Sequence, residues 1–344
     1  MAVSFDFKKR LGSGYFGEVW LVTDTGLGCD YALKCIPPHK VINQNNFYQE
    51  AQVLKSAEHT NIVRVQETGV LGDARIYVAM EFLENGSLED EASGAYVKLS
   101  RAKRLMIDVL RGLEYAHSKG IIHRDIKPAN ILIGNAGEGK LSDFGLAVPD
   151  FTTLKTANLK PYQYILHLAP EVMSFTDYTQ LSDIYACGVT LYRLVNGDSF
   201  LPQVDIPQAR MLALSGKYPD RENYREFIPR SLKSIINKAM EVDPDNRYKS
   251  SAEFRHALEQ VVLDIDWEET KLQNGIQWIG QKASIQYYLT RTQISNTRWS
   301  VIVKKGRDLA SLRKDNTLSR ENVSEKIAIA HSKKVLQGLV SAKK

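Results

Sequence analysis

Cysteine is scarce in this chain, and its few positions argue against a disulfide framework. The 344 residues include three cysteines, Cys29, Cys35 and Cys187, which are scattered and odd in number. Stable disulfides need paired cysteines, and small secreted proteins that rely on them are much richer in cysteine. We therefore expect a protein of a reducing compartment, the cytoplasm.

Long apolar runs are also missing. The best candidate for a membrane-spanning segment, residues 184–195, is interrupted by Gly188 and Arg193, whereas a spanning helix needs about 20 mostly apolar residues. The first residues, MAVSF, lack the charged-then-apolar design of a signal peptide. These two absences predict a cytoplasmic protein with no membrane partner.

The composition is that of an ordinary folded protein. Hydrophobic residues make up 43% of the chain and charged residues 25%, values that are typical of soluble domains. A chain of this length can bury a large core, and it is long enough for two domains or for one large domain with an appendage.

The most informative segment reads HRDIKPAN at residues 123–130, and DFG follows at residues 143–145. Phosphoryl transfer needs a carboxylate that can accept a hydroxyl proton, a cation that can reach a phosphate, and oxygen ligands for magnesium. Asp125 and Lys127 meet the first two needs, and Asn130 and Asp143 meet the third. Each residue alone could simply cap a turn, but the ordered set predicts a phosphotransferase.

A glycine-rich segment upstream gives an independent indication. Residues 11–19 read LGSGYFGEV, and glycines allow backbone amides to approach phosphates closely. The same spacing occurs in ordinary turns and in dinucleotide-binding folds, where a helix should follow. Here residues 19–22 read VWLV, which favours a strand-turn-strand hairpin over ATP phosphates.

A lysine follows this hairpin at the end of a short apolar strand. Residues 31–34 read YALK, and Lys34 fits the lysine that pairs with the α- and β-phosphates. It needs an acidic partner to hold its ammonium group. We expect Glu50, on a helical stretch over residues 47–54, rather than Glu58, which comes where that helix should have ended.

Together these motifs resemble those of the eukaryotic-type (Hanks-type) serine/threonine protein kinases. The sequence of residues 247–258 is similar to that of bacterial members of this family. The resemblance runs from about Phe5 to Val262. It includes an APE motif at residues 169–171 and Arg247, which resembles the arginine that pairs with the glutamate of that motif. A helix over residues 100–119, with one apolar stripe, is expected to be core beneath the catalytic loop. Its stripe consists of Leu105, Val109, Leu113 and Ala116.

The resemblance implies an α+β fold with two lobes. We expect a kinase domain over residues 1–262, with a small β-rich lobe over 1–80 and a larger helical lobe over 84–262. Met80 resembles the gatekeeper at the back of the nucleotide pocket, and backbone groups of Glu81 and Leu83 are expected to hold adenine. The full set expected to bind ATP is Leu11, Gly12, Gly14, Gly17, Val19, Ala32, Lys34, Met80, Glu81, Leu83 and Leu132.

The resemblance also implies a function. We expect an ATP- and magnesium-dependent enzyme that phosphorylates serine or threonine hydroxyls of protein substrates. Asp125, Lys127, Lys34 and Glu50 would be catalytic, and Asn130 and Asp143 would hold magnesium. The alternatives are a pseudokinase-like binding scaffold and a small-molecule phosphotransferase of related fold. Lys34, Asp125 and Asp143 are all present, which speaks against the scaffold.

The activation segment departs from the family pattern. Kinases of this type usually have Gly-Thr before the APE motif and an aromatic residue two positions before its alanine, but this chain has Gln163-Tyr164 and His167. This difference affects the expected peptide specificity. Arg124 resembles kinases that are activated by phosphorylation of this loop, so autophosphorylation is expected. The candidate acceptors are Thr152, Thr153 and Thr156.

Residues 263–344 form a basic appendage, joined without a low-complexity linker. They carry 15 lysines and arginines against 8 acids, a net charge of +7, whereas the preceding residues carry −2. Alternating apolar residues predict two strands over 284–289 and 298–303, separated by a turn over 292–297. A helix is expected after Ser319 as its N-terminal cap. Its irregular apolar stripe is expected to consist of Val323, Ile327, Ala330, Lys334 and Leu336 to Leu339.

This β-β-α appendage is expected to be a packing or docking module. A basic surface can attract an acidic partner or nucleic acid, but a net charge of this size is usually only solvated lysine. The aromatic residues of the appendage are expected to form a small core rather than a base-stacking platform. They are Trp278, Tyr287, Tyr288 and Trp299. We therefore expect a protein docking partner rather than nucleic acid.

Overall fold

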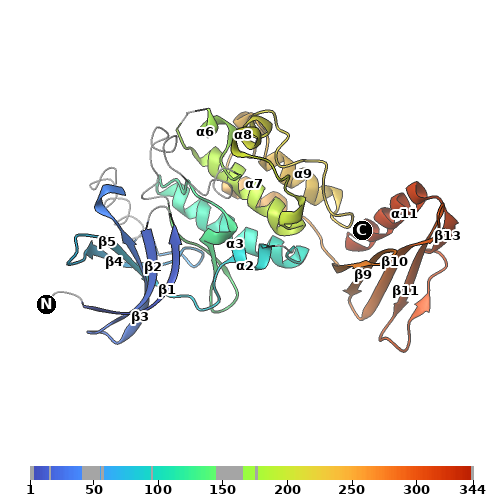
Figure 1. The fold of residues 1–344 in the computed structure, drawn as a ribbon, viewed down its shortest axis with the longest axis horizontal. Coiled ribbons are helices and arrows are strands. Elements are labelled where there is room, and N and C mark those ends of the chain that lie inside the picture. Colours follow the sequence, from blue (N-terminus) through green and yellow to red (C-terminus); the bar gives the residue numbers. More distant parts are fainter. Residues whose placement is uncertain are drawn as a thin grey trace.

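The computed structural model describes residues 4–14, 17–40, 55, 58–93, 96–144, 166–174 and 177–341. Three parts follow one another along the long axis of the molecule (Figure 1). An antiparallel sheet lies at the N-terminal end, a helical lobe lies in the middle, and a second sheet with one helix lies at the other end.

The N-terminal sheet has five antiparallel strands in the order β1-β2-β3-β5-β4. The strands are β1 (Phe5–Gly14), β2 (Gly17–Asp24), β3 (Cys29–Ile36), β4 (Val65–Val70) and β5 (Ile76–Glu81). The hairpin between β1 and β2 is the expected strand-turn-strand structure, because Gly14 pairs with Gly17. Gly17 has φ of +145°, and a Cβ there would lie 2.0 Å from the carbonyl oxygen of Cys35, so only glycine fits.

The helical lobe is built around α3 (Leu99–Ser118) and α7 (Gln180–Asn196). The predicted apolar stripe of α3 is confirmed, since Leu105, Val109 and Leu113 are fully buried. The other helices are α2 (Leu88–Ala92), α6 (Pro170–Met173), α8 (Ile206–Leu214), α9 (Arg230–Ala239) and α10 (Ser251–Glu259). A two-stranded sheet consists of β6 (Ile131–Ile133) and β7 (Gly139–Leu141). Single 3-10 turns are η1 (Pro38–Lys40), η2 (Pro128–Asn130), η3 (Asp198–Phe200) and η4 (Pro244–Asn246).

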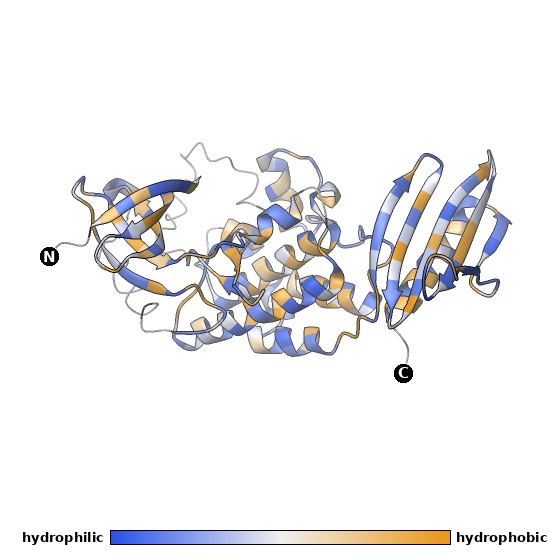
Figure 2. Cartoon of the chain, turned by 90° about the horizontal axis from the view of Figure 1, so that it is seen from below, coloured by the Kyte–Doolittle hydropathy of each residue, from blue (hydrophilic) through white to orange (hydrophobic). Residues whose placement is uncertain are grey.

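Apolar residues cluster on the helices of this lobe, and polar and apolar residues alternate along the strands of the C-terminal sheet (Figure 2). Within the described part of the chain, no helix combines the length and the apolar character needed to cross a bilayer.

The C-terminal sheet is larger than the sequence indicated. It has six strands, in the order β12-β11-β10-β9-β8 with β13 also paired to β11. The strands are β8 (Asp266–Leu272), β9 (Gly275–Lys282), β10 (Ile285–Ser295), β11 (Arg298–Gly306), β12 (Arg313–Lys314) and β13 (Arg320–Val323). The predicted strands correspond to β10 and β11, so the expectation of only two strands was wrong.

The predicted turn is present but confined to residues 296–297, and the predicted helix start was wrong. The segment over 292–297 is mostly strand, because β10 continues to Ser295 and pairs with β11. Helix α11 (Glu325–Val340) begins after Ser324 rather than Ser319. The Ser319 hydroxyl instead accepts a hydrogen bond from the Val303 amide at 2.9 Å, and β13 occupies the residues that follow.

The buried side of α11 agrees with the predicted stripe at Leu336 and differs from it elsewhere. Val323 lies in β13, and Ile327 and Lys334 are exposed. The buried residues of α11 are Ala328, Ser332, Val335, Leu336 and Val340. The expected small aromatic core is partly present, since Trp278 is fully buried while Tyr288 remains partly exposed.

Two largely buried ion pairs join this sheet to the helical lobe, in addition to the exposed pair of Lys98 and Glu268. Arg291 on β10 donates hydrogen bonds to both carboxylate oxygens of Glu226, at 2.6 and 2.9 Å. Arg225 donates to Glu269 on β8 at 2.7 Å, and its guanidinium lies 4.2 Å from the centre of the Tyr96 ring. The position of the sheet is therefore held by directional contacts.

Hydrogen bonds from the helical lobe also cover the free edge of β8. The Tyr96 hydroxyl donates to the Trp267 carbonyl and accepts from the Glu269 amide, both at 2.8 Å. Asp266 accepts hydrogen bonds from the amide, at 2.9 Å, and the hydroxyl of Ser100. Ser100 lies in the first turn of α3, where amides lack partners within the helix, so the C-terminal sheet supplies a cap for this helix.

Candidate active site

The loop before β6 brings three of the predicted catalytic and metal-binding side chains together. Lys127 Nζ lies 2.9 and 2.8 Å from the two carboxylate oxygens of Asp125. Asn130 Nδ2 donates to the Asp125 backbone carbonyl at 2.7 Å and to its carboxylate at 2.8 Å. The carboxylate of Asp125 is thus held in one orientation by a cation and an amide.

Asp183, near the start of α7, holds the backbone of this loop. Its side chain is 2% exposed and accepts hydrogen bonds from the amides of His123, at 2.8 Å, and Arg124, at 2.9 Å. His117 at the end of α3 lies 2.9 Å from the same carboxylate. Arg124 has φ of +71°, a conformation that costs free energy in a non-glycine residue and that these hydrogen bonds stabilise.

His123 lies beneath the loop and is completely buried. Burial disfavours the charged imidazolium and lowers the pKa of His123, although the nearby carboxylates of Asp183 and Asp125 oppose this effect. The hydrogen bonds match the neutral ring. Nε2 donates to the Ser142 carbonyl at 3.0 Å, and Nδ1 accepts from the Asp125 amide at 3.3 Å, so the ring connects the two segments that carry Asp125 and Asp143.

Lys34 and Asp143 meet between the two lobes. Lys34 Nζ on β3 lies 3.0 Å from Asp143 Oδ1. Burial disfavours the charged carboxylate, but attraction and hydrogen bonding by Lys34 outweigh it, and the pKa of Asp143 lies below its ordinary value. The expected partner Glu50 lies outside the described residues, and the rival Glu58 is exposed.

The side chains predicted to hold magnesium have suitable chemistry. Magnesium prefers oxygen ligands, often one or two carboxylates together with substrate phosphates. The lowered pKa keeps Asp143 ionised. Asn130 uses its Nδ2 atom for Asp125, which leaves its Oδ1 atom able to act as a ligand. The two residues therefore fit the metal.

The residues predicted to bind ATP lie mainly on four neighbouring strands of the N-terminal sheet, β1, β2, β3 and β5. Gly12 and Val19 pair across β1 and β2, and Ala32 pairs with Met80 across β3 and β5. The Glu81 amide donates to the Arg64 carbonyl at 3.0 Å, so the predicted contact with adenine would have to use the Glu81 carbonyl. The remaining members are Leu11, which is 41% exposed, Leu83, which is buried, Gly14 and Gly17 at the hairpin, and Leu132 on β6.

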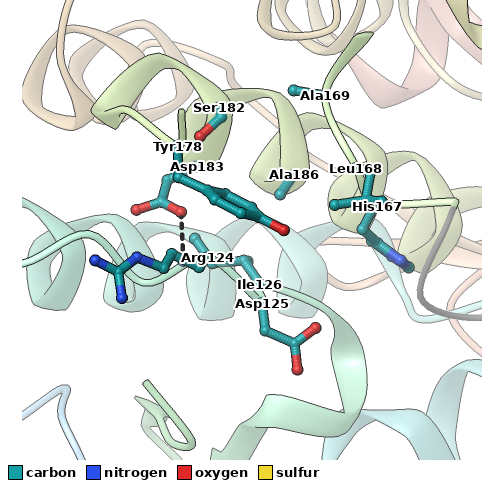
Figure 3. A pocket seen from close by; sticks show the side chains of 10 residues that line it. All are labelled: Arg124, Asp125, Ile126, His167, Leu168, Ala169, Tyr178, Ser182, Asp183 and Ala186. Atoms are coloured by element: carbon teal, nitrogen blue, oxygen red, sulfur yellow. Dashed lines mark hydrogen bonds between the residues drawn. The ribbon is translucent and has the colours of Figure 1, made fainter. Parts of the chain in front are cut away.

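The APE motif lies next to the catalytic loop. Glu171 forms a two-pronged ion pair with Arg247 at 2.7 Å for both contacts, as the resemblance implied. The segment before it brings His167 to a small pocket that Asp125 and Tyr178 also line (Figure 3). The unusual His167 thus shares a pocket with the residue predicted to be the catalytic base. Gln163, Tyr164 and the candidate phosphosites Thr152, Thr153 and Thr156 lie outside the described residues.

Sequence reasoning found the reacting groups but gave no role to the residues that support them. It did not connect Asp183 to the catalytic loop, and it did not single out His117 or the ring of His123. Asp183 is 60 residues from His123 and 66 from His117. A separation of this size has no local spacing signal.

Comparisons with known proteins agree with this geometry. The family model described as "Protein kinase domain" matches residues 5–261. The serine/threonine-protein kinase PknJ of Mycobacterium tuberculosis is 31% identical over 264 residues, which cover 74% of this chain and 44% of PknJ. The serine/threonine-protein kinase PrkC of Bacillus subtilis is 30% identical over 268 residues, which cover 76% of this chain and 41% of PrkC.

A solved structure shows the same fold. The crystal structure of Rad53 1–466 in complex with AMP-PNP has a TM-score of 0.63 and 27% identity, and the match covers 75% of this chain and 65% of that one. The match spans less than half the length of PknJ and PrkC. The predicted bilobal kinase fold is confirmed, and this chain belongs to the protein kinase family, with bacterial serine/threonine kinases among its relatives.

Proposed function

We propose that this protein is an active serine/threonine protein kinase that transfers the γ-phosphoryl group of ATP to a protein hydroxyl. The observation that carries the proposal is the arrangement around Asp125, whose carboxylate contacts Lys127 and Asn130. The relatives named above support the choice of serine and threonine. We assign the kinase domain to residues 1–262, with lobes over 1–80 and 84–262, and the basic appendage to 263–344.

Asp125 orients the acceptor hydroxyl and accepts its proton. Its carboxylate is only 13% exposed, so few water molecules compete for it, and Asn130 fixes its direction. Lys127 contacts this carboxylate and can reach the transferring phosphoryl group, where negative charge develops in the transition state. Positioning by these residues supplies much of the rate enhancement, because phosphoryl transfer demands little covalent help.

The other end of ATP is held between the lobes. Lys34 contacts the α- and β-phosphates, and Glu50 holds its ammonium group. The β1–β2 hairpin covers the phosphates, with the predicted strand residues around the adenine and ribose. Asn130 and Asp143 would hold magnesium, which neutralises charge on the β- and γ-phosphates when it is bound.

The activation segment is the proposed site of regulation by phosphorylation. Thr152, Thr153 and Thr156 are proposed autophosphorylation sites, because a phosphate on this segment can pair with Arg124. Peptide mapping of protein incubated with ATP and magnesium tests this assignment. It is wrong if a substrate is phosphorylated while residues 152–156 remain unmodified.

The first test is a phosphotransfer assay with the full chain. Wild type and Asp125→Ala are incubated with radiolabelled ATP, magnesium and a generic basic protein, and the labelled amino acid is identified. We expect label on serine or threonine and a loss of about 10³-fold in the variant. A folded wild type that binds ATP without transferring label would instead be a binding scaffold, and label on a small molecule alone would indicate the other phosphotransferase class.

A further inference from the structure

A partly buried ion pair lies beside the predicted adenine contact, where the N-terminal sheet meets the helical lobe. Glu81, the last residue of β5, accepts a hydrogen bond from Lys140 Nζ of β7 at 2.8 Å. The two side chains are 23% and 13% exposed, so few water molecules compete for either charge. The predicted adenine contact uses the backbone of Glu81, which leaves its carboxylate free to hold β5 against β7.

The backbone reinforces this ion pair through the segment over residues 61–64. The Arg64 amide donates to the same carboxylate oxygen of Glu81 at 2.9 Å, and the Glu81 amide donates to the Arg64 carbonyl at 3.0 Å. Next to it, the Val63 amide donates to the Leu141 carbonyl on β7 at 2.8 Å. The end of β5, this segment and β7 are therefore connected to one another, and the ion pair closes the set.

Strand β7 is also connected to both predicted magnesium ligands. Asp143 follows the last residue of this strand, Leu141, by two positions. Strand β6, which pairs with β7, begins immediately after Asn130. The Ser142 amide donates to the Asn130 carbonyl at 2.9 Å, which joins the two ligand-bearing segments. Lys140 thus links the adenine end of the proposed site to its magnesium end.

A bound nucleotide has to reach both ends of this site at once. In the proposed site, adenine contacts the Glu81 backbone, while the phosphates and their magnesium contact Asp143 and Asn130. Such a ligand gains its full affinity only when the two ends are held at the right separation, because a misplacement of about 1 Å weakens the contacts at one of them. Adenosine lacks phosphates, so its affinity depends on the adenine end alone.

We infer that Lys140 is a positioning residue for nucleotide binding, which acts through Glu81 and sets the separation between the adenine contact and the magnesium ligands. This role rests on the proposed function, which locates the two ends. Loss of the ion pair leaves each end intact but allows the end of β5 to shift relative to β7. Ligands that span both ends should then lose affinity, whereas ligands that occupy only the adenine end should not.

Nucleotide affinity is measured on the full chain by isothermal titration calorimetry, with adenosine and with ADP plus magnesium as the probes. Neither probe is a phosphoryl donor for the proposed reaction, so the result does not depend on catalysis. In Lys140→Met, we expect the Kd of ADP with magnesium to rise by about tenfold, while the Kd of adenosine changes by less than about twofold. Lys140→Arg retains the positive charge and should recover most of the lost affinity.

Glu81→Gln tests whether Lys140 acts through Glu81. This change removes the charge of the side chain and keeps the backbone that would contact adenine. It should weaken the binding of ADP with magnesium by the same factor as Lys140→Met, and the double variant should bind no more weakly than either single variant. Losses that add in the double variant would overturn the inference, because the two side chains would then act independently.

The matched control is Lys8→Met. Lys8 forms an ion pair of the same length, 2.8 Å, with Asp30 on the same sheet, but both side chains are exposed. This change should leave the Kd of both probes as in the parent, and a rise for ADP equal to that in Lys140→Met would overturn the inference.

The two probes separate positioning from simpler effects. Equal weakening of both probes in Lys140→Met would overturn the inference, because the damage would then lie at the adenine end itself. Unchanged affinity for both probes would also overturn it and would show that the ion pair only stabilises the fold. A parent protein that shows the expected difference between the probes but transfers no phosphoryl group would support the positioning role and contradict only the proposed catalytic activity.

Discussion

The two sheets at opposite ends of this molecule both contact the helical lobe through an ion pair, but the two pairs differ in accessibility. Lys34 and Asp143 join the N-terminal sheet to the loop after β7, and their side chains are 16% and 30% exposed. Arg291 and Glu226 join the C-terminal sheet to the loop before α9, and their side chains are 7% and 26% exposed. Ser332 also contacts both members of the second pair.

We therefore expect the first ion pair to take part in catalysis and the second to attach the C-terminal sheet to the helical lobe. The charges of Lys34 and Asp143 can be shared with a substrate, because both side chains are partly exposed at the junction of the two lobes. Arg291 and Glu226 satisfy each other with two parallel hydrogen bonds and are joined by Ser332, so both charges are engaged within the protein. The first pair should control rate, and the second should control stability.

The largest effect is expected when the N-terminal pair is broken. Asp143→Asn keeps the size of the side chain but removes the charge that holds Lys34 and the metal. We expect phosphotransfer to fall by about 10³-fold, with a change in the free energy of unfolding of about 1 kcal/mol or less. Steady-state kinetics and urea unfolding measure the two quantities. Activity within tenfold of wild type would show that this pair is not catalytic.

Breaking the ion pair between Arg291 and Glu226 should reduce stability and leave catalytic activity unchanged. Arg291→Met leaves the Glu226 carboxylate without its partner, which is expected to cost about 3 kcal/mol of stability, while the folded fraction retains its specific activity. Arg298→Met, at an exposed position of β11, is the control and should change stability by about 0.5 kcal/mol or less. Equal losses in the two variants would contradict the proposed role of the pair.

A smaller effect is expected at the cap that β8 provides for α3. Asp266→Ala removes the acceptor for the Ser100 amide and hydroxyl and should cost about 1 kcal/mol. Glu268→Ala removes a neighbouring ion pair whose members are more than half exposed and should cost less than about 0.5 kcal/mol. Thermal and urea unfolding distinguish them, and a ranking in the reverse order would refute the capping role.

The smallest effect concerns pH. The folded state lowers the pKa of His123, so the unfolded chain binds more protons, and stability is lost as the pH falls below the ordinary histidine value. This contribution amounts to about 0.7 kcal/mol between pH 7 and pH 6. The slope of unfolding free energy against pH should decrease in His123→Gln and remain in His256→Gln, an exposed control. An unchanged slope in the first variant would show that His123 is not responsible.

The sequence was informative where chemistry or local periodicity restricts the choice of residues. Asp125, Lys127, Asn130 and Asp143 could be identified because the reaction needs those groups in that order, and the stripe of α3 follows from helical spacing. The structure places the first three in contact, but their catalytic roles remain predictions. The ATP-binding set and the magnesium ligands likewise remain predictions.

The sequence was less informative about the C-terminal sheet. Strand β8 reads DWEETKL, which shows no clear alternation of apolar and polar residues. One reason is that the polar Glu269 is directed to the covered face, where it pairs with Arg225. Arg291 pairs with Glu226, which is 65 residues away in the sequence, and Asp266 accepts a hydrogen bond from Ser100, which is 166 residues away. Such contacts depend on how whole elements pack, which no local pattern encodes.

The hydroxyl of Tyr96 has a practical consequence for work with this protein. An unpaired strand edge can recruit strands from other molecules and seed aggregates, and Tyr96 occupies the hydrogen-bonding groups of Trp267 and Glu269 on such an edge. Division of the chain after residue 262 would uncover this edge in one fragment and leave the start of α3 uncapped in the other. Fragments divided at that point should aggregate, so the two parts are better produced as one polypeptide.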